Sequence, residues 1–506
     1  MGEGVSPPVL DGDSFPVGNN SMPPVASPRL GTSGCDYTGR IEFDKKPKLS
    51  FEVEFSVIRL THISSCGILS SFLTKEGHKM ILEFIVENFR SIDEEQVLSF
   101  YTKGTQGGNL GNTVVLPDTP YRILKSIGLY GSNASGKTNI LRALWTLRRM
   151  VCASYRFGED EHIRWYDPCI FDTARRDGAT RFEIDLTIPM EDGLRRFLYT
   201  VAYNQTEVIE ESLTTFTKNR PARLFSRKRG DTRETIALGA SLRGGDRKIA
   251  FFKNQSYLSV AGRNAGAPLI MRKVYQYFRT QFTQIRLNEE DWDFSSNEDV
   301  DAARLIRFVD VGVTDVKQRI VDDAAIEVRL PPDMPIALRQ RLLNRVKNRY
   351  VFTHEANRGE FGELDLREES DGTRRMFGLF PQVVDVLTRG GVFIIDEIEC
   401  GMHPFMAETL VRLFNDSEAN VGQAQLLFTT HNSNLMSPNL LRRDQIWFTE
   451  KKCGRTRCYS LDDFDKKMVT PTSPYVKWYL EGRFGAIPSI DFAGLVEAVI
   501  ALRERR

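Results

Sequence analysis

Cysteine, histidine and tryptophan are scarce in this chain of 506 residues, which contains seven, six and five of them respectively. Seven scattered cysteines, an odd number, do not predict a disulfide framework. Cys453 and Cys458 resemble half of a metal site, but the sequence has no second half with ligand spacing. This cysteine usage fits a reducing cytoplasm best.

Long apolar runs and an excess of charge of either sign are also absent. The longest apolar stretches have the length of a strand, short of the ~18 residues that a membrane span needs. The first residues lack the charged start and apolar centre of a secretory signal. The formal net charge is +1, so no global field favours nucleic acid or a membrane as partner. The composition is that of a globular protein long enough for one large core or two to three domains.

The most informative stretch is SIGLYGSNASGKT, residues 126–138. It begins as a short apolar strand and continues as a loop that matches G-x-x-x-x-G-K-[ST] at every fixed position. Glycines let consecutive backbone N–H groups surround a phosphate, and the following helix directs its positive end at the same anion. Apolar residues recur at helical spacing after the loop, as the motif requires. These features predict a nucleotide site formed by Gly131, Ser132, Asn133, Ala134, Ser135, Gly136, Lys137, Thr138 and Asn139.

Two elements are expected to supply the chemistry of this site. Lys137 is expected to reach the β and γ phosphates, and the Thr138 hydroxyl to ligate Mg²⁺. Far along the chain, four apolar residues are followed directly by Asp396 and Glu397. This pattern predicts a buried parallel strand that delivers both carboxylates to the sheet edge where α/β proteins bind ligands. Asp396 is expected to hold Mg²⁺, directly or through water, and Glu397 to polarise the attacking water as a general base.

Further polar residues lie on either side of the acidic strand. Before it, Ser370 and Gly372 open a helical run, and a Ser-x-Gly turn at a helix N-terminus predicts a second anion site. After it, an apolar strand ends at His431, which is suited to hydrogen-bond a γ-phosphate or the attacking water. Because His431 comes after the phosphate loop, the Ser-Asp-Gly-Thr turn and the Asp-Glu pair in this order, we interpret it as a catalytic nucleotide sensor.

The chain before Met80 differs in pattern from the rest of the sequence. Residues 1–79 begin with a stretch rich in Pro, Gly and Ser that has no sustained period, which predicts disorder. Strand-like alternation starts directly after Met80, so a domain over residues 80–506 is expected, with Met80 as a candidate translation start. The alternative for residues 1–79 is a genuine regulatory arm.

A large insertion, residues 190–365, is expected between the phosphate loop and the Ser-Asp-Gly-Thr turn. We expect β-hairpins first and mainly helix from about 265 to 350. Two segments of this insertion, 218–233 and 339–349, are strongly basic. Segment 218–233 is either a nucleic-acid contact or a solvated hairpin tip. Segment 339–349 is a nucleic-acid or partner surface or an exposed helix, and the solvated alternative is favoured for both segments.

The order of these motifs resembles the ABC-type ATPases, including SMC and RecF heads, more than AAA+ ring motors. A closer resemblance is to the ABC-like AAA-family ATPases of prokaryotic phage defence, of the RloA and abortive-infection type. It extends from residue 80 to the C-terminus. Seven collinear segments carry it: ILEFIVENFRSI, LYGSNASGKTNILRAL, ESDGTRRMF, IIDEIECGMHP, FTTHNSNLM, LLRRDQIWF and GRFGAIP.

The resemblance implies a P-loop NTPase of ABC-ATPase type, an α/β fold with a mixed β-sheet and a helical insertion. It implies ATP and Mg²⁺ as cofactors, ATP hydrolysis, and a homodimer or higher oligomer in which Ser370 and Gly372 face the phosphate loop of the other subunit. It also implies a separately encoded effector, often a nuclease of RloB or TOPRIM type, and places His403 in the loop that crosses the dimer interface. The sequence departs from the transporter consensus, because SDGT stands where LSGGQ would be and no glutamine loop is found near 165–178.

The leading hypothesis is therefore an ATP-driven switch that controls an effector. The alternative is a DNA-repair or recombination ATPase of SMC/RecF type that binds DNA directly, although the long heptad arms of SMC proteins are absent. A self-contained nuclease is rejected, because no acidic constellation at a strand end stands out after His431.

Overall fold

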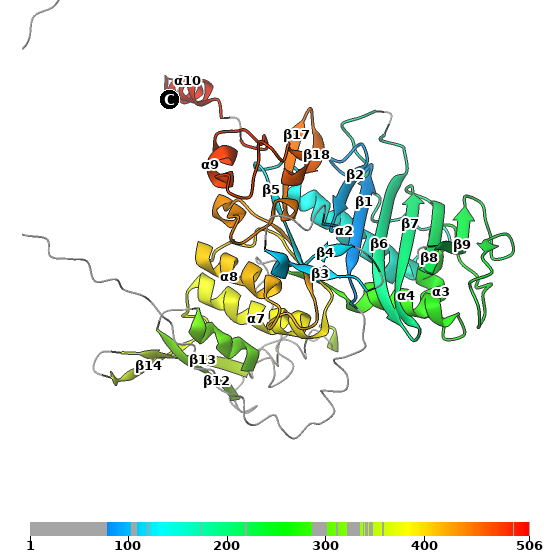
Figure 1. Cartoon of the computed structure of the whole chain (residues 1–506), viewed down its shortest axis with the longest axis horizontal. Coiled ribbons are helices and arrows are strands. Elements are labelled where there is room, and N and C mark those ends of the chain that lie inside the picture. The colour runs from blue at the N-terminus through cyan, green and yellow to red at the C-terminus, as the bar shows by residue number, and fades with distance from the viewer. Residues whose placement is uncertain are drawn as a thin grey trace, which may run out of the picture. The chain divides into compact units, whose positions relative to one another are not determined.

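The computed structural model places the predicted nucleotide-site motifs in one large sheet, next to a second sheet (Figure 1). The expectation of disorder for residues 1–79 lies, up to residue 77, outside the described residues. The structure describes residues 78–102, 109–285 and 301–504, with gaps at 118, 120, 174, 218–219, 310–311, 321–333, 337–338, 340–342, 344–347, 357–358 and 489.

The phosphate loop belongs to a six-stranded sheet whose strands are parallel except for the last pair, β17 and β18. The predicted mixed α/β sheet is thus confirmed. Successive residues of its inner strands face opposite cores: Val392 and Ile394 pack on one side, Phe393 and Ile395 on the other. This double burial explains why the strands are continuously apolar. In sheet order the strands are β11 (Phe282–Ile285), β15 (Val392–Ile395), β16 (Gln425–Thr429), β5 (Ser126–Tyr130), β17 (Ile446–Lys452) and β18 (Arg455–Ser460).

Helices cover both faces of this sheet. The core on one face includes α2 (Lys137–Ala153), α3 (Tyr257–Arg263) and α4 (Leu269–Thr280), and that on the other includes α7 (Asp371–Arg389) and α8 (Pro404–Asn415). The apolar residues expected on one face of the helix after the phosphate loop are buried, which confirms the predicted amphipathic helix. Helices α9 (Tyr475–Leu480) and α10 (Phe492–Glu504) follow near the C-terminus.

The antiparallel hairpins form a separate seven-stranded sheet, rather than joining the sheet of the phosphate loop. The strand expected after Met80 is confirmed as β1; in the neighbouring β6, Phe182, Ile184, Leu186 and Ile188 recur with period two and are all buried. In sheet order the strands are β10 (Ala237–Leu238), β9 (Arg220–Lys228), β8 (Val208–Thr217), β7 (Gly193–Tyr203), β6 (Thr180–Met190), β1 (Ile81–Glu87) and β2 (Gln96–Ser99).

Two expectations for the insertion are met only in part. The basic residues 220–228 form strand β9, in which Arg227 is buried, 3.6 Å from the buried carboxylate of Glu211, whereas Arg223 and Lys228 are exposed. The described part of 265–350 contains helix α4 and the 3-10 helix η3 (Arg304–Phe308), but also strands β11, β12 (Val313–Ile320) and the start of β13 (Asn348–Glu355). Alternating Tyr350 and Phe352 pack on Phe377 of α7, which favours a strand at this point.

The basic segment 339–349 is described only at residues 339, 343, 348 and 349, and its last two residues begin β13, so the expected exposed helix does not extend that far.

Two smaller sheets complete the described strands. One contains β12 (Val313–Ile320), β13 (Asn348–Glu355) and β14 (Phe361–Asp365), and the other pairs β3 (Thr113–Val115) with β4 (Arg122–Leu124). Short 3-10 helices are η1 (Leu110–Asn112), η2 (Ser154–Arg156), η3 (Arg304–Phe308), η6 (Ser433–Met436), η7 (Arg443–Gln445) and η8 (Leu461–Asp463). Within the described ranges, no helix combines the length and the apolarity needed to cross a bilayer.

Candidate functional site

The phosphate loop connects the fully buried strand β5 to the N-terminus of α2. Gly131, Ala134 and Gly136 all have positive φ, at 152°, 60° and 112°. The two glycines are also required by packing: a Cβ on Gly131 would lie 2.4 Å from the carbonyl oxygen of Thr449, and one on Gly136 would lie 2.2 Å from Oγ1 of Thr456. The loop conformation therefore depends on residues that lack side chains.

Strands β17 and β18 form the floor beneath this loop. The hydroxyls of Ser135 and Thr449 are 2.6 Å apart, and Thr456 Oγ1 donates to the carbonyl oxygen of Ser135 at 2.8 Å. Sequence reasoning missed both threonines, because Ser135 and Thr449 are separated by 314 positions and no local pattern marks the pair. Ser135 thus binds the floor through its side chain and its carbonyl, and its N–H donates to Ser132 within the loop.

Lys137 is almost fully buried and folds back over the loop that precedes it. Its ammonium donates to the carbonyl oxygens of Gly131 at 2.8 Å and Ser132 at 3.0 Å. Burial lowers the pKa of Lys137 to about 8, although the nearby carboxylates of Glu397 and Asp396 oppose this shift. The loop therefore holds a cation whose charge is costly to bury and which an anion would stabilise.

The two predicted metal ligands lie next to each other. Thr138 Oγ1 donates to Oδ1 of Asp396 at 3.1 Å, across 258 positions of sequence. The same oxygen accepts a hydrogen bond from Thr429 Oγ1 at 2.6 Å. A hydroxyl and one carboxylate fit Mg²⁺, because this ion is commonly bound by one or two protein oxygens together with substrate phosphates. Among the described residues no cluster of three or more Asp, Glu, His or Cys forms an all-protein metal cage.

The residues after β15 carry two more carboxylates toward the same edge. Glu397 has a positive φ of 53° and an exposed side chain, and its N–H donates to Thr429 Oγ1 at 2.7 Å. Glu399 was missed by sequence reasoning, although it stands two positions after the predicted pair. It accepts hydrogen bonds from Thr430 Oγ1 at 2.6 Å and from the backbone N–H of His431 at 2.5 Å. Glu399 therefore ties the ends of β15 and β16 together.

His431 lies just beyond the end of β16 and is exposed. Its pKa is lowered, first by partial desolvation and then by the positive charge of Lys137, so its ring stays neutral near pH 7. The imidazole therefore lies within electrostatic range of the Lys137 ammonium. The structure thus brings together the phosphate loop, Asp396, Glu397 and His431, as the motif order predicts.

Ser370 and Gly372 are not part of this assembly within the chain. Ser370 is the N-cap of α7, and its Oγ accepts a hydrogen bond from the backbone N–H of Thr373 at 3.1 Å. Gly372 packs close to the turn after the acidic strand, since a Cβ there would lie 3.2 Å from the carbonyl oxygen of Gly401. Among the described residues, no hydrogen bond or ion pair joins Ser370 or Gly372 to residues 131–138. His403, also predicted at an interface, is the exposed N-cap of α8.

The segment after β1 reaches the first turn of α2. Asn139 donates from Nδ2 to Ser91 Oγ at 2.7 Å and accepts from Arg90 Nη1 at 3.4 Å. Arg90 also forms a 2.6 Å ion pair with Asp167, in the region where no glutamine loop was found. The side chain of Asn139 therefore anchors this segment, and Arg90 adds a positive charge beside the helix N-terminus that sequence reasoning did not single out.

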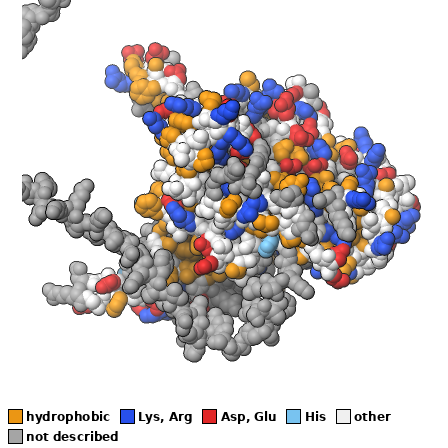
Figure 2. Space-filling model, viewed as in Figure 1, with side chains coloured by type: hydrophobic (Ala, Val, Ile, Leu, Met, Phe, Trp, Pro, Cys, Tyr) orange, Lys and Arg blue, Asp and Glu red, His pale blue; other side chains and the backbone are white. Residues whose placement is uncertain are grey.

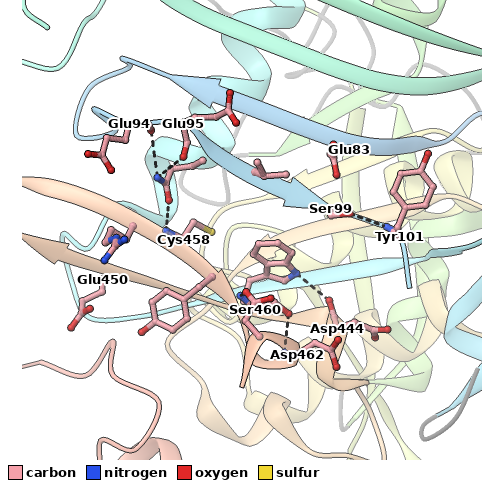
Figure 3. Close-up of a pocket in the computed structure, with 16 residues that line it drawn as sticks. Glu83, Glu94, Glu95, Ser99, Tyr101, Asp444, Glu450, Cys458, Ser460 and Asp462 are labelled. Carbon is pink, nitrogen blue, oxygen red and sulfur yellow. Dashed lines mark hydrogen bonds between the residues drawn. The ribbon is translucent and has the colours of Figure 1, made fainter. Parts of the chain in front are cut away.

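A groove of about 680 Å³ lies elsewhere, between β2 and β18 (Figure 3). No residue of the predicted site lines it. Seven carboxylates and a single arginine do, so its charge disfavours a polyphosphate. The carboxylates are those of Glu83, Glu94, Glu95, Asp444, Glu450, Asp462 and Asp463.

Comparisons with known proteins agree with this geometry. Residues 126–437 match the family model described as "AAA domain, putative AbiEii toxin, Type IV TA system", a range that includes the phosphate loop, the acidic strand and His431. No curated protein matches the chain.

Among solved structures, the SMC head domain from Thermotoga maritima is similar at 10% identity, over 75% of this chain and 98% of that one, with a TM-score of 0.35. An SMC head bound to the C-winged helix domain of ScpA is similar at 11% identity, over 75% and 97% of the two chains, with a TM-score of 0.31. Scores this low carry no functional argument. The family match covers more than half of the sequence, and the chain therefore belongs to this family of P-loop AAA ATPase domains.

Proposed function

We propose that this protein binds and hydrolyses ATP and acts as a switch that dimerises around the nucleotide. One observation carries the proposal: Thr138 and Asp396 are 258 positions apart in sequence and hydrogen-bonded in space, beside a phosphate loop. Hydroxyl, carboxylate and lysine then surround one point, which is the set of groups that phosphoryl transfer needs.

Each residue has a role in this proposal. Lys137 and the loop N–H groups bind the β and γ phosphates, and Thr138 with Asp396 holds Mg²⁺. The bound Mg²⁺ would neutralise charge that develops on the phosphates. Glu397 polarises the attacking water, and His431, held by Glu399 through its backbone, senses the γ-phosphate.

Ser370 and Gly372 complete the site of a second subunit. They lie at the N-terminus of α7, whose 19 residues span about 28 Å. Strand β15, which follows it, spans only about 13 Å, so the start of α7 extends past the sheet edge. The positive end of that helix and the Ser370 hydroxyl suit the γ-phosphate of a nucleotide bound to another copy.

We further propose that residues 80–506 act as one ATPase domain in the cytoplasm of a prokaryote and control a separately encoded effector in phage defence. The resemblance across seven collinear motifs supports a nuclease of RloB or TOPRIM type as this effector. The alternative is direct DNA binding: Arg227 of the basic segment is buried against Glu211, whereas Arg223 and Lys228 of the same strand are exposed and could face a partner.

Mixing two strongly impaired variants tests the shared site. Lys137→Ala removes the phosphate-binding half and Ser370→Asp the opposing half, and random pairing of equal amounts restores one intact site in half of the dimers. ATPase activity should return to about a quarter of the wild-type value.

The matched control mixes Lys137→Ala with Asp396→Asn. Both residues belong to the same half of the site, so no pairing restores an intact site and no activity should return. If the activity of the first mixture also stays at the average of its two components while each variant remains folded by circular dichroism, the site is not shared between subunits.

A further inference from the structure

A buried pair of polar side chains holds the turn before α7 to the three-stranded sheet. Glu369 directly precedes the N-cap Ser370, and its side chain is only 6% exposed. Oε1 of Glu369 lies 2.6 Å from Nε2 of His354 on strand β13. Because a carboxylate accepts, the imidazole N–H is the donor. Within the described residues, no other hydrogen bond or ion pair reaches this carboxylate.

This bond fixes the position of the start of α7. A hydrogen bond to a carboxylate is stronger than one between neutral groups, and a buried carboxylate without a partner is strongly unfavourable. Separating Glu369 from His354 would leave such a group. Since Glu369 is adjacent to Ser370, the place of the Ser370 hydroxyl is tied to β13.

Apolar contacts join the same two elements further along. The ring centroid of Phe377, seven positions after Ser370, lies 5.0 Å from that of Tyr350 and 5.2 Å from that of Phe352. Figure 1 shows the sheet of β12, β13 and β14 beside α7. Buried side chains are packed at crystal-like density and do not slide freely. A displacement of β13 would therefore be passed on to the start of α7.

The start of α7 also packs on the segment after the acidic strand. A Cβ on Gly401, whose φ is 63°, would collide with the guanidinium of Arg375. Arg375 Nη1 lies 3.6 Å from Cys400 Sγ, and the N–H of Cys400 donates to the carbonyl oxygen of Glu397 at 2.8 Å. The first turns of α7 thus contact both β13 and the segment that carries the proposed base.

The outer strand of the small sheet carries side chains of every kind. Figure 2 shows hydrophobic, acidic and basic side chains close together where Figure 1 labels β14. Phe361 is exposed there, and Glu363 forms a 2.6 Å ion pair with Arg319 of β12. Such a mixed surface selects neither an anion nor a cation. The buried link to α7 is therefore the more specific feature of this sheet.

We propose that His354 is a positioning residue, which through Glu369 sets how well Ser370 completes the nucleotide site of a second copy. This role deepens the proposed function and rests on it. Among the described residues, His354 makes no hydrogen bond to residues 131–138 or to the two carboxylates after β15. Its effect must pass through the turn, so the rate of hydrolysis depends on it and the ATP affinity of a single chain does not.

Amide hydrogen exchange of the full-length chain tests the link without nucleotide. The N–H groups of Thr373 and Arg374 donate to the Ser370 hydroxyl and carbonyl. His354→Leu should raise their exchange rates on the order of 10-fold, because the first turn opens more easily. Thr353→Val is the control, since this buried neighbouring hydroxyl has no hydrogen-bond partner among the described residues. It should leave the rates unchanged, and unchanged rates in His354→Leu overturn the proposal.

A double variant separates positioning from stability. His354→Leu leaves the Glu369 carboxylate buried and unpaired, so both the melting temperature and the ATPase rate should fall, the latter by about 10-fold. In His354→Leu, Glu369→Leu both polar groups are gone, and the melting temperature should return toward wild type. The ATPase rate should stay low, because the turn still lacks its anchor. A rate that returns together with the stability would make the pair structural only.

The conservative variant is His354→Gln, whose amide N–H lies the same number of bonds from Cβ as the Nε2–H of the ring. It should keep most of the ATPase activity, whereas His354→Leu does not. ATP affinity should stay within about 3-fold of wild type in both variants. Equal loss of activity in the two variants, or a larger loss of affinity, overturns the proposal.

Mixing assigns His354 to one half of the shared site. His354→Leu mixed with Lys137→Ala should reach about a quarter of the wild-type activity, because half of the dimers then contain one intact site. His354→Leu mixed with Ser370→Asp should show only the average of its components, since both changes lie in the same half. Recovery in the second mixture, or none in the first, overturns the proposal.

Failure of this role is distinguishable from failure of the proposed function. If Lys137→Ala recovers activity with Ser370→Asp but not with His354→Leu, the shared site stands and the role of His354 is wrong. If Lys137→Ala recovers with neither, the shared site is wrong and the role of His354 falls with it.

Discussion

Helices α2 and α7 both begin with residues that the proposed function assigns to nucleotide binding, and the N–H groups at the two helix starts are satisfied in opposite ways. The N-cap of α2 is Gly136, and no side chain accepts a hydrogen bond from its first turn. The N-cap of α7 is Ser370, whose hydroxyl accepts from Thr373 N–H. Unsatisfied N–H groups at a helix start attract an anion, so α2 is open to one while α7 already supplies its own acceptor.

Under the proposed function, this difference divides the nucleotide site into an acceptor half at α2 and a completing half at α7. The α2 half contains the buried cation Lys137 and the paired oxygens of Thr138 and Asp396, and we expect it to bind phosphate by itself. The α7 half offers the Ser370 hydroxyl and the positive end of the helix dipole, at a helix start that reaches past the sheet edge. We infer that α7 adds to a nucleotide already bound, and substitutions confined to one half at a time separate the two contributions.

The largest effect is expected from removing the proposed base in the α2 half. Glu397→Gln should lower the rate of ATP hydrolysis on the order of 10²- to 10⁴-fold, because the amide cannot accept the proton of the attacking water. ATP affinity should change by no more than about 3-fold, since the side chain is exposed and the phosphate-binding groups are intact. Phosphate release and equilibrium binding measure the two quantities.

Glu418→Gln, the same change at an exposed position of the chain, is the control for Glu397→Gln. Its hydrolysis rate should equal that of wild type. A Glu397→Gln protein that hydrolyses ATP normally would mean that another group, with Glu399 the nearest candidate, activates the water.

A smaller effect is expected at the start of α7, where a pair of substitutions separates capping from phosphate contact. Asn and Asp both replace Ser as N-caps at little cost, whereas Ser370→Ala should lower the free energy of unfolding by about 1 kcal/mol. Ser370→Asp should lower ATPase activity on the order of 10-fold, because its carboxylate would face the triphosphate. Ser370→Asn introduces a side chain of the same shape as Asp but without its charge, so this variant should retain most of the ATPase activity.

Thermal unfolding and ATPase assays on the three Ser370 variants decide between the two roles. Equal ATPase activity of the Asp and Asn variants would mean that Ser370 only caps α7 and does not face the triphosphate. The difference between the starts of α2 and α7 would then affect folding and not ligand binding.

The smallest effect is a dependence of ATP affinity on pH. Because the folded protein lowers the pKa of Lys137 to about 8 from an ordinary value near 10.5, the nucleotide-free lysine loses its charge as the pH rises through 8. Apparent ATP affinity should therefore fall by up to about 10-fold per pH unit above 8, with uptake of a proton on binding. Isothermal titration in buffers of different ionisation enthalpy measures that proton.

A Lys137→Arg protein is the control for this pH dependence, since arginine stays charged throughout the range. Whatever its absolute affinity, its binding should not decline above pH 8. An identical decline in both proteins would assign the titration to another group.

Sequence reasoning predicts the α2 half well, because each part of it is a local pattern. The strand, the glycine-bounded loop and the amphipathic helix are contiguous, and so are the apolar strand and the carboxylates of Asp396 and Glu397. Because parallel strands end at the same edge of a sheet, the phosphate loop and the two carboxylates are expected to meet there. The structure confirms the elements and brings the side chains together, and their chemical roles remain predictions.

What the sequence could not predict depends on contacts between distant segments. Thr449 and Thr456 support Ser135 from the far end of the chain, and Arg90 reaches Asn139 from the turn after β1. Residues 265–350 were expected to be mainly helical, but β11 there pairs with β15, more than 100 positions away, and β12 pairs with β13. Arg227 lies in a segment that was expected to be solvated, and it is buried because Glu211 of the neighbouring strand supplies its counter-charge.

The floor of the phosphate loop has a consequence for biosynthesis. Thr456 lies 321 positions after Ser135, and beyond the family-matched range that ends at residue 437. During translation the loop therefore leaves the ribosome long before the strands that shape it. A nascent or truncated chain that lacks β17 and β18 has the complete motif but not its support, so we expect nucleotide binding to begin only when synthesis is nearly finished. An incomplete chain would then be unable to send an ATP-dependent signal.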